Sequence, residues 1–190
     1  IVLFSTNDDP ENFRFFLVAV KWLFAQSIEE GIPMKGGIAH GKISINKSEQ
    51  VYFGQAIIDA YFIEEDVNYF GITAHNSIDK YIVENSKKIN MKYFNELLFE
   101  CPTPLKSGKV VHTNIKWLNN LSVYNEDADE KDNVEYIINV IKRFRLSSSG
   151  SPRRYVDNTI EIINALKTEN PESRQKNVSL NNSKRYNIFR

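Results

Sequence analysis

The chain has 190 residues with 24 basic and 24 acidic side chains, so its formal net charge is zero. This length predicts one domain with a sizeable core, and the balanced charge argues against nucleic acid as a partner. No apolar run reaches the roughly 18 residues that a membrane span needs. A single cysteine, Cys101, excludes an internal disulfide and favours a cytoplasmic protein. We interpret Cys101 as a small residue at a strand end, with a reactive thiol as the alternative.

The N-terminal part predicts a strand followed by a long helix. Residues 1–5 (IVLFS) are apolar and β-prone, which predicts a buried strand. Asp9 and Pro10 suit the cap and first turn of a helix that runs to about Glu30, where Gly31 ends it. The apolar residues of this helix recur at helical spacing, and this face either packs on a sheet or contributes to a dimer. Because the chain opens on Ile rather than Met, we expect it to be a fragment.

A glycine-containing strand, a hairpin and a second helix come next. Residues 34–53 predict a strand that contains Gly37 and Gly41, a tight turn and a return strand. A helix then opens on Gly54 and runs to about Asp66. Glycine weakens the interior of a strand, so its presence indicates a close approach by another backbone or by a ligand.

The remaining elements complete an α+β pattern. They are a strand, a helix capped by Ser77, two antiparallel strands and two amphipathic helices, over residues 69–74, 77–82, 91–100, 109–117, 134–144 and 153–166. This order predicts helices on one face of a mainly antiparallel sheet. After residue 166 the composition changes to Asn, Ser, Lys and Arg. We therefore expect a domain over 1–166 and a flexible basic tail over 167–190.

The segment GGIAHGKI, followed after the turn by VYFGQAIIDAYFIEE, resembles the core of class III nucleotidyl cyclase catalytic domains. Those domains carry Gly-Ile-x-x-Gly on a strand, then a hairpin, then a glycine that opens a helix. Gly37, Gly41 and Gly54 stand at these glycine positions. With the order of elements, the likeness extends over residues 1–84. It implies a ferredoxin-like cyclase core, here followed by a C-terminal extension.

The resemblance also implies a chemistry. Class III cyclases convert a nucleoside triphosphate into a 3′,5′-cyclic nucleotide and pyrophosphate with Mg²⁺ or Mn²⁺, and they act as dimers with sites at the interface. A homodimer is therefore expected. The two metal-binding aspartates of the family would precede or abut Ile1, so the resemblance implies a metal site upstream of this chain rather than within it.

The chain departs from the family at three positions. The asparagine and arginine of the family's helix fall on Ile58 and Phe62, and the base-reading aspartate of purine cyclases falls on Val51. In losing the purine-reading residue, the chain is similar to the bacterial pyrimidine cyclases of anti-phage signalling, which make cyclic UMP or cyclic CMP. Two interpretations remain: a divergent cyclase, or a degenerate cyclase-like domain that binds a nucleotide or a protein partner.

Arg153 and Arg154 are candidates for binding phosphate. They follow a Ser- and Gly-rich loop at the start of a helix, where backbone N–H groups and guanidinium groups together suit an anion. In the alternative interpretation, Ser151 and Pro152 only start the helix and the arginines pair with the acidic residues of 126–132.

Three further polar residues lie near the expected pocket. Gln55 and Asp59 are on the helix that follows the hairpin, and Asp59 is adjacent to the lost asparagine position, so that a one-residue shift of the helix would let it contact the ribose. His40 lies on the glycine-containing strand and would face a nucleotide. Surface roles for Gln55 and Asp59, and a structural role for His40, are the alternatives. No pair of histidines has the spacing of metal ligands on a helix.

Overall fold

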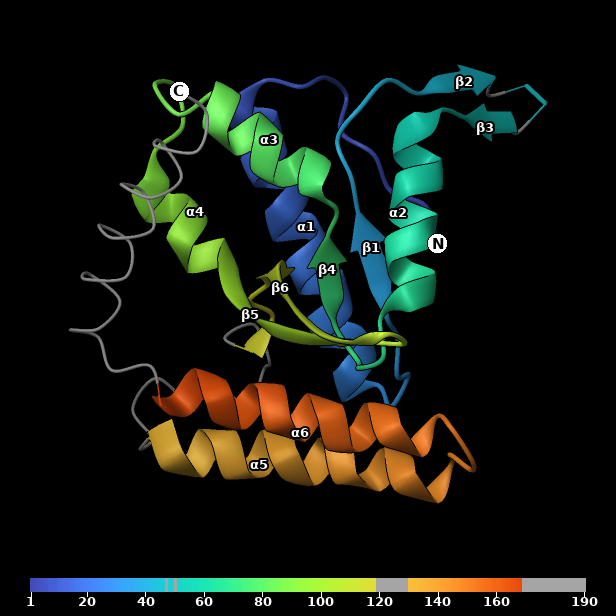
Figure 1. Cartoon of the computed structure of the whole chain (residues 1–190), viewed down its shortest axis with the longest axis vertical. Coiled ribbons are helices and arrows are strands. Elements are labelled where there is room, and N and C mark those ends of the chain that lie inside the picture. Colours follow the sequence, from blue (N-terminus) through green and yellow to red (C-terminus); the bar gives the residue numbers. More distant parts are fainter. Residues whose placement is uncertain (47, 50, 119–129, 169–190) are drawn as a thin grey trace.

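The computed structural model describes residues 1–46, 48–49, 51–118 and 130–168 (Figure 1). Its centre is a four-stranded sheet in the order β1-β4-β6-β5. These strands are Gly36–Ile38, Ile72–Ala74, Gly108–Ile115 and Leu98–Leu105, in that spatial order. β1 and β4 are parallel, whereas the β4–β6 and β5–β6 pairs are antiparallel. The α+β prediction therefore holds at the level of a mixed sheet with helices, in which two of the three pairings are antiparallel, as expected, and the β1–β4 pairing is parallel.

Helices cover both faces of this sheet, which corrects the prediction of a single covered face. Gly37 of β1 abuts α2 (Gln55–Asp66). The neighbouring Ile38 packs in the core cluster that contains the buried face of α1 (Pro10–Glu29). Because successive residues of a strand face opposite sides, α1 and α2 lie on opposite faces of the sheet.

The broad apolar face of α1 is part of the core. Its buried side chains include Phe13, Leu17, Val20, Phe24 and Ile28. Of the two interpretations of this face, packing on the sheet is the one observed, so the face is not available to a dimer. The helix begins at Pro10, as predicted from the fixed φ of proline at the first helical position.

The prediction of a buried strand over residues 1–5 is wrong. This segment has no strand pairing, and Ile1, Val2, Leu3 and Phe4 are 92%, 59%, 46% and 41% exposed. The β-propensity of these residues is real, but propensity yields a strand only where a partner supplies ladder hydrogen bonds and burial.

The predicted strand over 34–45 is divided in two. β1 ends at Ile38, and β2 (Ser44–Asn46) pairs antiparallel with β3 (Val51–Phe53) in a separate two-stranded sheet. The hairpin and the helix behind it are thus where the sequence predicts them, but the hairpin extends away from the central sheet (Figure 1).

The second half of the chain holds one clear error of element type. Met91–Leu97 is a helix, α4, and not the start of a strand. The side chain of Asn90 caps it by accepting a hydrogen bond from the Lys92 amide at 3.1 Å. β5 begins only at Leu98 and includes Pro102 and Pro104, which were expected in a connection.

The C-terminal helices form a layer across one end of the sheet (Figure 1). The remaining helices are α3, α5, the short 3₁₀ helix η2 and α6, over Asn76–Glu84, Glu130–Arg143, Phe144–Leu146 and Arg153–Thr168. α6 contacts the core through Val156, Ile162 and Ile163. It extends two residues beyond the predicted domain limit at 166, and residues 169–190 of the predicted tail lie outside the described residues.

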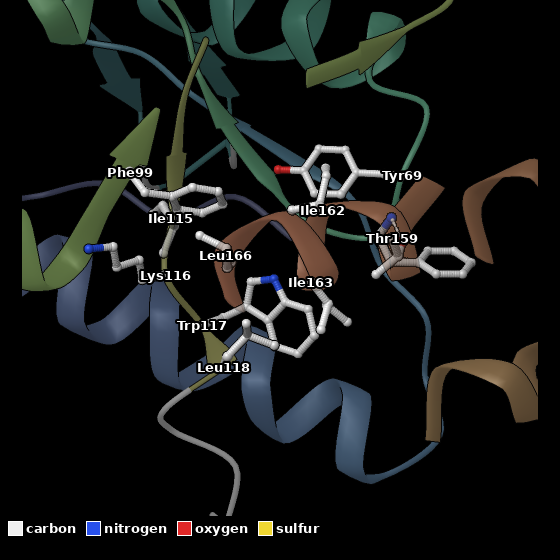
Figure 2. Close-up of a pocket in the computed structure, with 11 residues that line it drawn as sticks. Tyr69, Phe99, Ile115, Lys116, Trp117, Leu118, Thr159, Ile162, Ile163 and Leu166 are labelled. Carbon is white, nitrogen blue, oxygen red and sulfur yellow. Dashed lines mark hydrogen bonds between the residues drawn. The ribbon is translucent and has the colours of Figure 1, made fainter. Parts of the chain in front are cut away.

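A small crevice lies between the sheet and α6 (Figure 2). Its volume is about 10 Å³, and apolar side chains such as Phe99, Trp117 and Ile162 line most of it. A site for an organic ligand encloses some hundreds of Å³, so we regard this crevice as a packing defect of the core.

A hydrogen-bonded network is buried beside that crevice. The Asn114 side-chain oxygen accepts hydrogen bonds from the hydroxyls of Tyr69 at 2.7 Å and Thr73 at 2.8 Å. The Asn114 amide nitrogen donates to the Thr103 hydroxyl at 2.8 Å. Burial raises the pKa of Tyr69 well above its ordinary value. These polar groups are satisfied by one another, so the network serves the core rather than a ligand.

Candidate functional site

Polar groups on or directly after four elements, β1, β4, α2 and α3, meet at one end of the central sheet. His40 follows β1, and His75 follows β4. Because β1 and β4 are parallel, the residues that follow them lie at the same end of the sheet. Open α/β sheets commonly bind ligands at this end, beyond the carboxyl ends of the strands. Gln55 and Asp59 of α2 lie at the same end of the sheet. We refer to His40, Gln55, Asp59, His75 and Ser77 as the β1/β4 cluster.

Hydrogen bonds, with one longer polar contact between Asp59 and His75, connect the cluster from α2 to α3. Gln55 Nε2 donates to Asp59 Oδ1 at 2.7 Å, and Asp59 Oδ2 lies 3.7 Å from His75 Nδ1. The same His75 nitrogen lies 3.1 Å from Ser77 Oγ, which accepts a hydrogen bond from the His40 amide at 2.8 Å. Asp59 is thus directed towards α3, not into bulk solvent.

The order of atoms limits the chemistry of this cluster. Ser77 Oγ and Asp59 both approach Nδ1 of His75. A Ser–His–Asp relay requires the hydroxyl and the carboxylate to use different ring nitrogens, so these three residues do not form one. The groups present can instead donate and accept hydrogen bonds, as recognition of a polar ligand requires.

His75 and Ser77 were not recognised from the sequence as site residues. The sequence predicts Ser77 as the cap of α3, but the cap is His75, whose side chain accepts from the Ser77 amide. The sequence did contain an indication of this role. His75 comes directly after a predicted strand, and ligands commonly bind beyond the carboxyl ends of strands.

His40 is held by an aromatic contact. Its ring lies 4.5 Å from the ring of Tyr81, centroid to centroid. The Tyr81 hydroxyl donates to the backbone oxygen of Asp8. Burial, together with the charges of Asp8 and Asp9, raises the pKa of Tyr81. The His40 ring therefore has a structural contact, in keeping with the structural role given as its alternative. Its backbone amide joins the cluster by donating to Ser77 Oγ.

The three motif glycines are favoured by geometry. A Cβ on Gly37 would lie 2.1 Å from the backbone oxygen of Ala60, so β1 and α2 meet without room for a side chain. Gly54 has φ +151°, and a Cβ there would lie 2.4 Å from the backbone oxygen of Lys42. Gly41 has φ +158°, which also favours glycine, although a Cβ there would make only an ordinary contact with Ala56, at 3.4 Å.

Large apolar side chains are also exposed on α2, close to the polar residues of the cluster. Ile58 is 46% exposed and Phe62 is 64% exposed, and Tyr61 lies between them. The hairpin adds exposed apolar side chains on both of its sides, Ile45 and Tyr52 on one and Val51 and Phe53 on the other. We call these seven residues the α2–hairpin face.

Arg153 and Arg154 lie away from the β1/β4 cluster. Both are exposed at the start of α6. In the next turn, Asn158 Nδ2 donates to the backbone oxygen of Asn68, which precedes β4. The start of α6 is therefore at the amino end of β4, whereas His75 marks the carboxyl end. The structure does not bring the arginines and the cluster together, and the acidic side chains of 126–132 lie outside the described residues.

The described residues do not fit a divalent metal. Among them, no group of three or more His, Cys, Asp or Glu side chains lies close enough together to hold an ion. The Mg²⁺ or Mn²⁺ that the resemblance implies would need ligands from elsewhere. Cys101 is buried within β5 and not at its end, in keeping with a packing role.

Comparisons with known proteins do not assign the chain to a family. No family model matches it, and neither a curated protein nor a solved structure does. In the part of the chain that the structure describes, no helix has both the length and the apolar character needed to cross a membrane.

Proposed function

We propose that this chain is a domain of the class III nucleotidyl cyclase type, which forms a 3′,5′-cyclic nucleotide and pyrophosphate from a nucleoside triphosphate. The observation that carries the proposal is the junction of β1 with α2. Gly37 packs against Ala60 with no room for a Cβ, and Gly54 opens the helix after the hairpin. The close approach at two of the three motif glycines supports the proposal.

In this reaction the ribose 3′-oxygen attacks the α-phosphorus of the triphosphate. The bond from that phosphorus to the bridging oxygen breaks, pyrophosphate leaves, and the 3′-hydroxyl proton passes to solvent. We assign Asp59 and Gln55 to the ribose. The Asp59 carboxylate accepts hydrogen bonds and the Gln55 amide donates them, at the carboxyl end of β1 and β4. The Mg²⁺ or Mn²⁺ that the resemblance implies would be held by residues outside the described ones and would stabilise the charge on the phosphates.

We further propose that the domain acts as a homodimer through the α2–hairpin face. Its seven side chains are large, apolar and exposed on two adjoining elements, and exposed apolar groups gathered in this way commonly mark an interaction site. The buried face of α1 is not available for that role. Uridine and cytidine triphosphates are the preferred substrates in this proposal, because Val51 stands where purine cyclases carry an aspartate.

A degenerate cyclase-like binding module is the second candidate. The observation that favours it is the exposed apolar pair Ile58 and Phe62, at positions where the family places polar catalytic side chains. In this version the domain binds a nucleotide or a protein and catalyses nothing.

One experiment separates the two candidates. The full-length protein, with any segment upstream of Ile1 included, is incubated with ATP, GTP, CTP or UTP and Mn²⁺, and cyclic nucleotide and pyrophosphate are measured by mass spectrometry. A cyclic product that disappears in Asp59→Asn supports the cyclase. Nucleotide binding by calorimetry without product supports the module. A folded chain that neither binds nor converts any of the four nucleotides contradicts both nucleotide proposals.

A further inference from the structure

The inference starts from the open edge of the central sheet, which is β1. The Gly36 amide donates to the Gly71 oxygen at 2.9 Å, and the Ile38 oxygen accepts from the His75 amide at 2.8 Å, so Gly36 and Ile38 direct their backbone groups towards β4. Because these groups alternate in direction along a strand, the N–H and C=O of Gly37 point to the open side. Unpaired groups of this kind form a template for another strand.

The other edge of the sheet is protected. β5 carries Pro102 and Pro104, which have no N–H to donate. The Pro104 oxygen accepts a hydrogen bond from the Asn68 amide at 2.9 Å, so Pro104 directs its backbone away from β6. Pro102, two residues earlier, has the same orientation. The prolines therefore make β5 a poor partner for a further strand. β1 consists of Gly, Gly and Ile and has no such protection.

A groove of about 170 Å³ runs along the open edge, between β1 and α1. Its lining is almost wholly apolar and includes Val20 and Phe24 of α1 together with the backbone of β1. Ile1 and Leu3 also line it. The N-terminal segment is therefore already seated beside the edge.

The side chains of this segment alternate as in a strand. Ile1 and Leu3 are directed to the groove on the α1 side. Phe4 instead contacts the hairpin, where its ring lies 5.9 Å from that of Tyr52. A strand added to β1 would show the same division, with alternate side chains on the two faces of the sheet.

We propose that the β1 edge accepts a further strand and that residues Ile1–Phe4 are that strand. In this change, which we call closure, the segment pairs with the backbone groups of Gly37 and buries Ile1 and Leu3 in the groove. The segment suits this role, because Ile and Val favour strands and residues 1–4 contain neither proline nor charge. The proposal does not depend on cyclase activity.

Amide exchange of the isotopically labelled chain, followed by NMR, tests it. Closure slows exchange at Gly37, and Leu3→Asp should accelerate that exchange about tenfold, because a charge in the groove opposes the pairing. Leu146→Asp is the matched control, since Leu146 is an exposed leucine on η2, and it should leave the Gly37 rate unchanged. Exchange at Thr73, between β1 and β6, reports whether each variant keeps its sheet.

Two results would overturn the proposal. One is an unchanged exchange rate at Gly37 in Leu3→Asp while Thr73 stays protected. The other is protection of Gly37 that increases with protein concentration, because a second copy would then be the strand that occupies the edge.

Discussion

Gly37 fixes the distance between β1 and α2. A methyl group there would lie 2.1 Å from Ala60 O and 2.4 Å from Ile63 Cγ2. Gly37→Ala must therefore separate the strand from the helix, and we expect a loss of roughly 3 kcal/mol in the free energy of unfolding. Chemical denaturation followed by circular dichroism measures it.

The neighbouring glycine supplies the control. A Cβ on Gly36 would make only an ordinary contact, 3.4 Å from Ile72 Cγ1. Gly36→Ala should change the free energy of unfolding by less than about 1 kcal/mol. Equal losses in the two variants would contradict the close approach of β1 and α2.

Tyr69 makes stability depend on pH at the alkaline end. Burial raises its pKa in the folded chain, so the folded state keeps a proton that the unfolded state releases near pH 10. The stabilisation is therefore complete below about pH 10 and declines as the pH rises, by up to about 1.4 kcal/mol per pH unit. Denaturation between pH 8 and pH 11 measures this slope.

Tyr69→Phe should flatten that slope. It also removes the hydrogen bond to Asn114, so we expect a loss of about 1–2 kcal/mol at pH 8. Tyr136→Phe, at an exposed tyrosine of α5, is the control and should leave the slope as it is. The assignment to Tyr69 would be refuted by identical slopes in Tyr69→Phe and the unmodified chain.

At the scale of elements, α2 carries polar and apolar side chains close together. Asp59 faces α3 through His75, while Ile58 and Phe62 are exposed beside it on the helix surface. If the exposed apolar side chains form a dimer, Phe62→Lys should raise the dissociation constant at least tenfold, because a charge replaces a large apolar contact. Analytical ultracentrifugation measures this constant.

Leu146→Lys tests whether the location of the change matters. It places the same charge on another exposed apolar residue, distant in sequence from α2, and should leave association unchanged. Loss of association in Leu146→Lys alone would assign the interface to the C-terminal layer.

The start of α6 carries a separate prediction. If Arg153 and Arg154 bind phosphate, the double change to alanine should lower triphosphate affinity about tenfold or more, because charge-assisted hydrogen bonds are lost. Both side chains are exposed, so the melting temperature should hardly move. Calorimetry and thermal denaturation provide the two measurements.

A charge-matched pair controls for non-specific attraction. Lys87 and Lys88 are adjacent and exposed after α3. Their double change to alanine removes the same charge and should leave affinity nearly unchanged. An equal loss of affinity would indicate general attraction of the anion, and a large fall in melting temperature for the arginine pair would mark it as structural.

At the scale of the whole molecule, helical periodicity was the most informative part of the sequence. It located α1, α2 and α6, because the apolar stripe of a helix is a local property. The same rule was misapplied at α4. Phe94 and Leu97 are three residues apart and both buried, which is helical spacing, and Asn90 is a favourable cap. The alternation of Tyr93, Leu97 and Phe99 concealed this signal.

The assembly of the sheet and of the site could not be predicted in the same way. Asp59 and His75 come together because β1 pairs with β4 in parallel, and a pairing between distant segments leaves no local pattern. Likewise, the prolines of β5 indicated a connection, since proline is excluded from central strands. An edge strand tolerates them.

Asn114 has a consequence for how the molecule unfolds. Its one side chain bonds to Tyr69 and Thr73, around β4, and to Thr103 of β5, while its own backbone lies in β6. No one of these strands can detach without leaving a buried polar group unsatisfied. We therefore expect the three strands to form one cooperative unit in hydrogen exchange, with β1 opening independently at the margin of that unit.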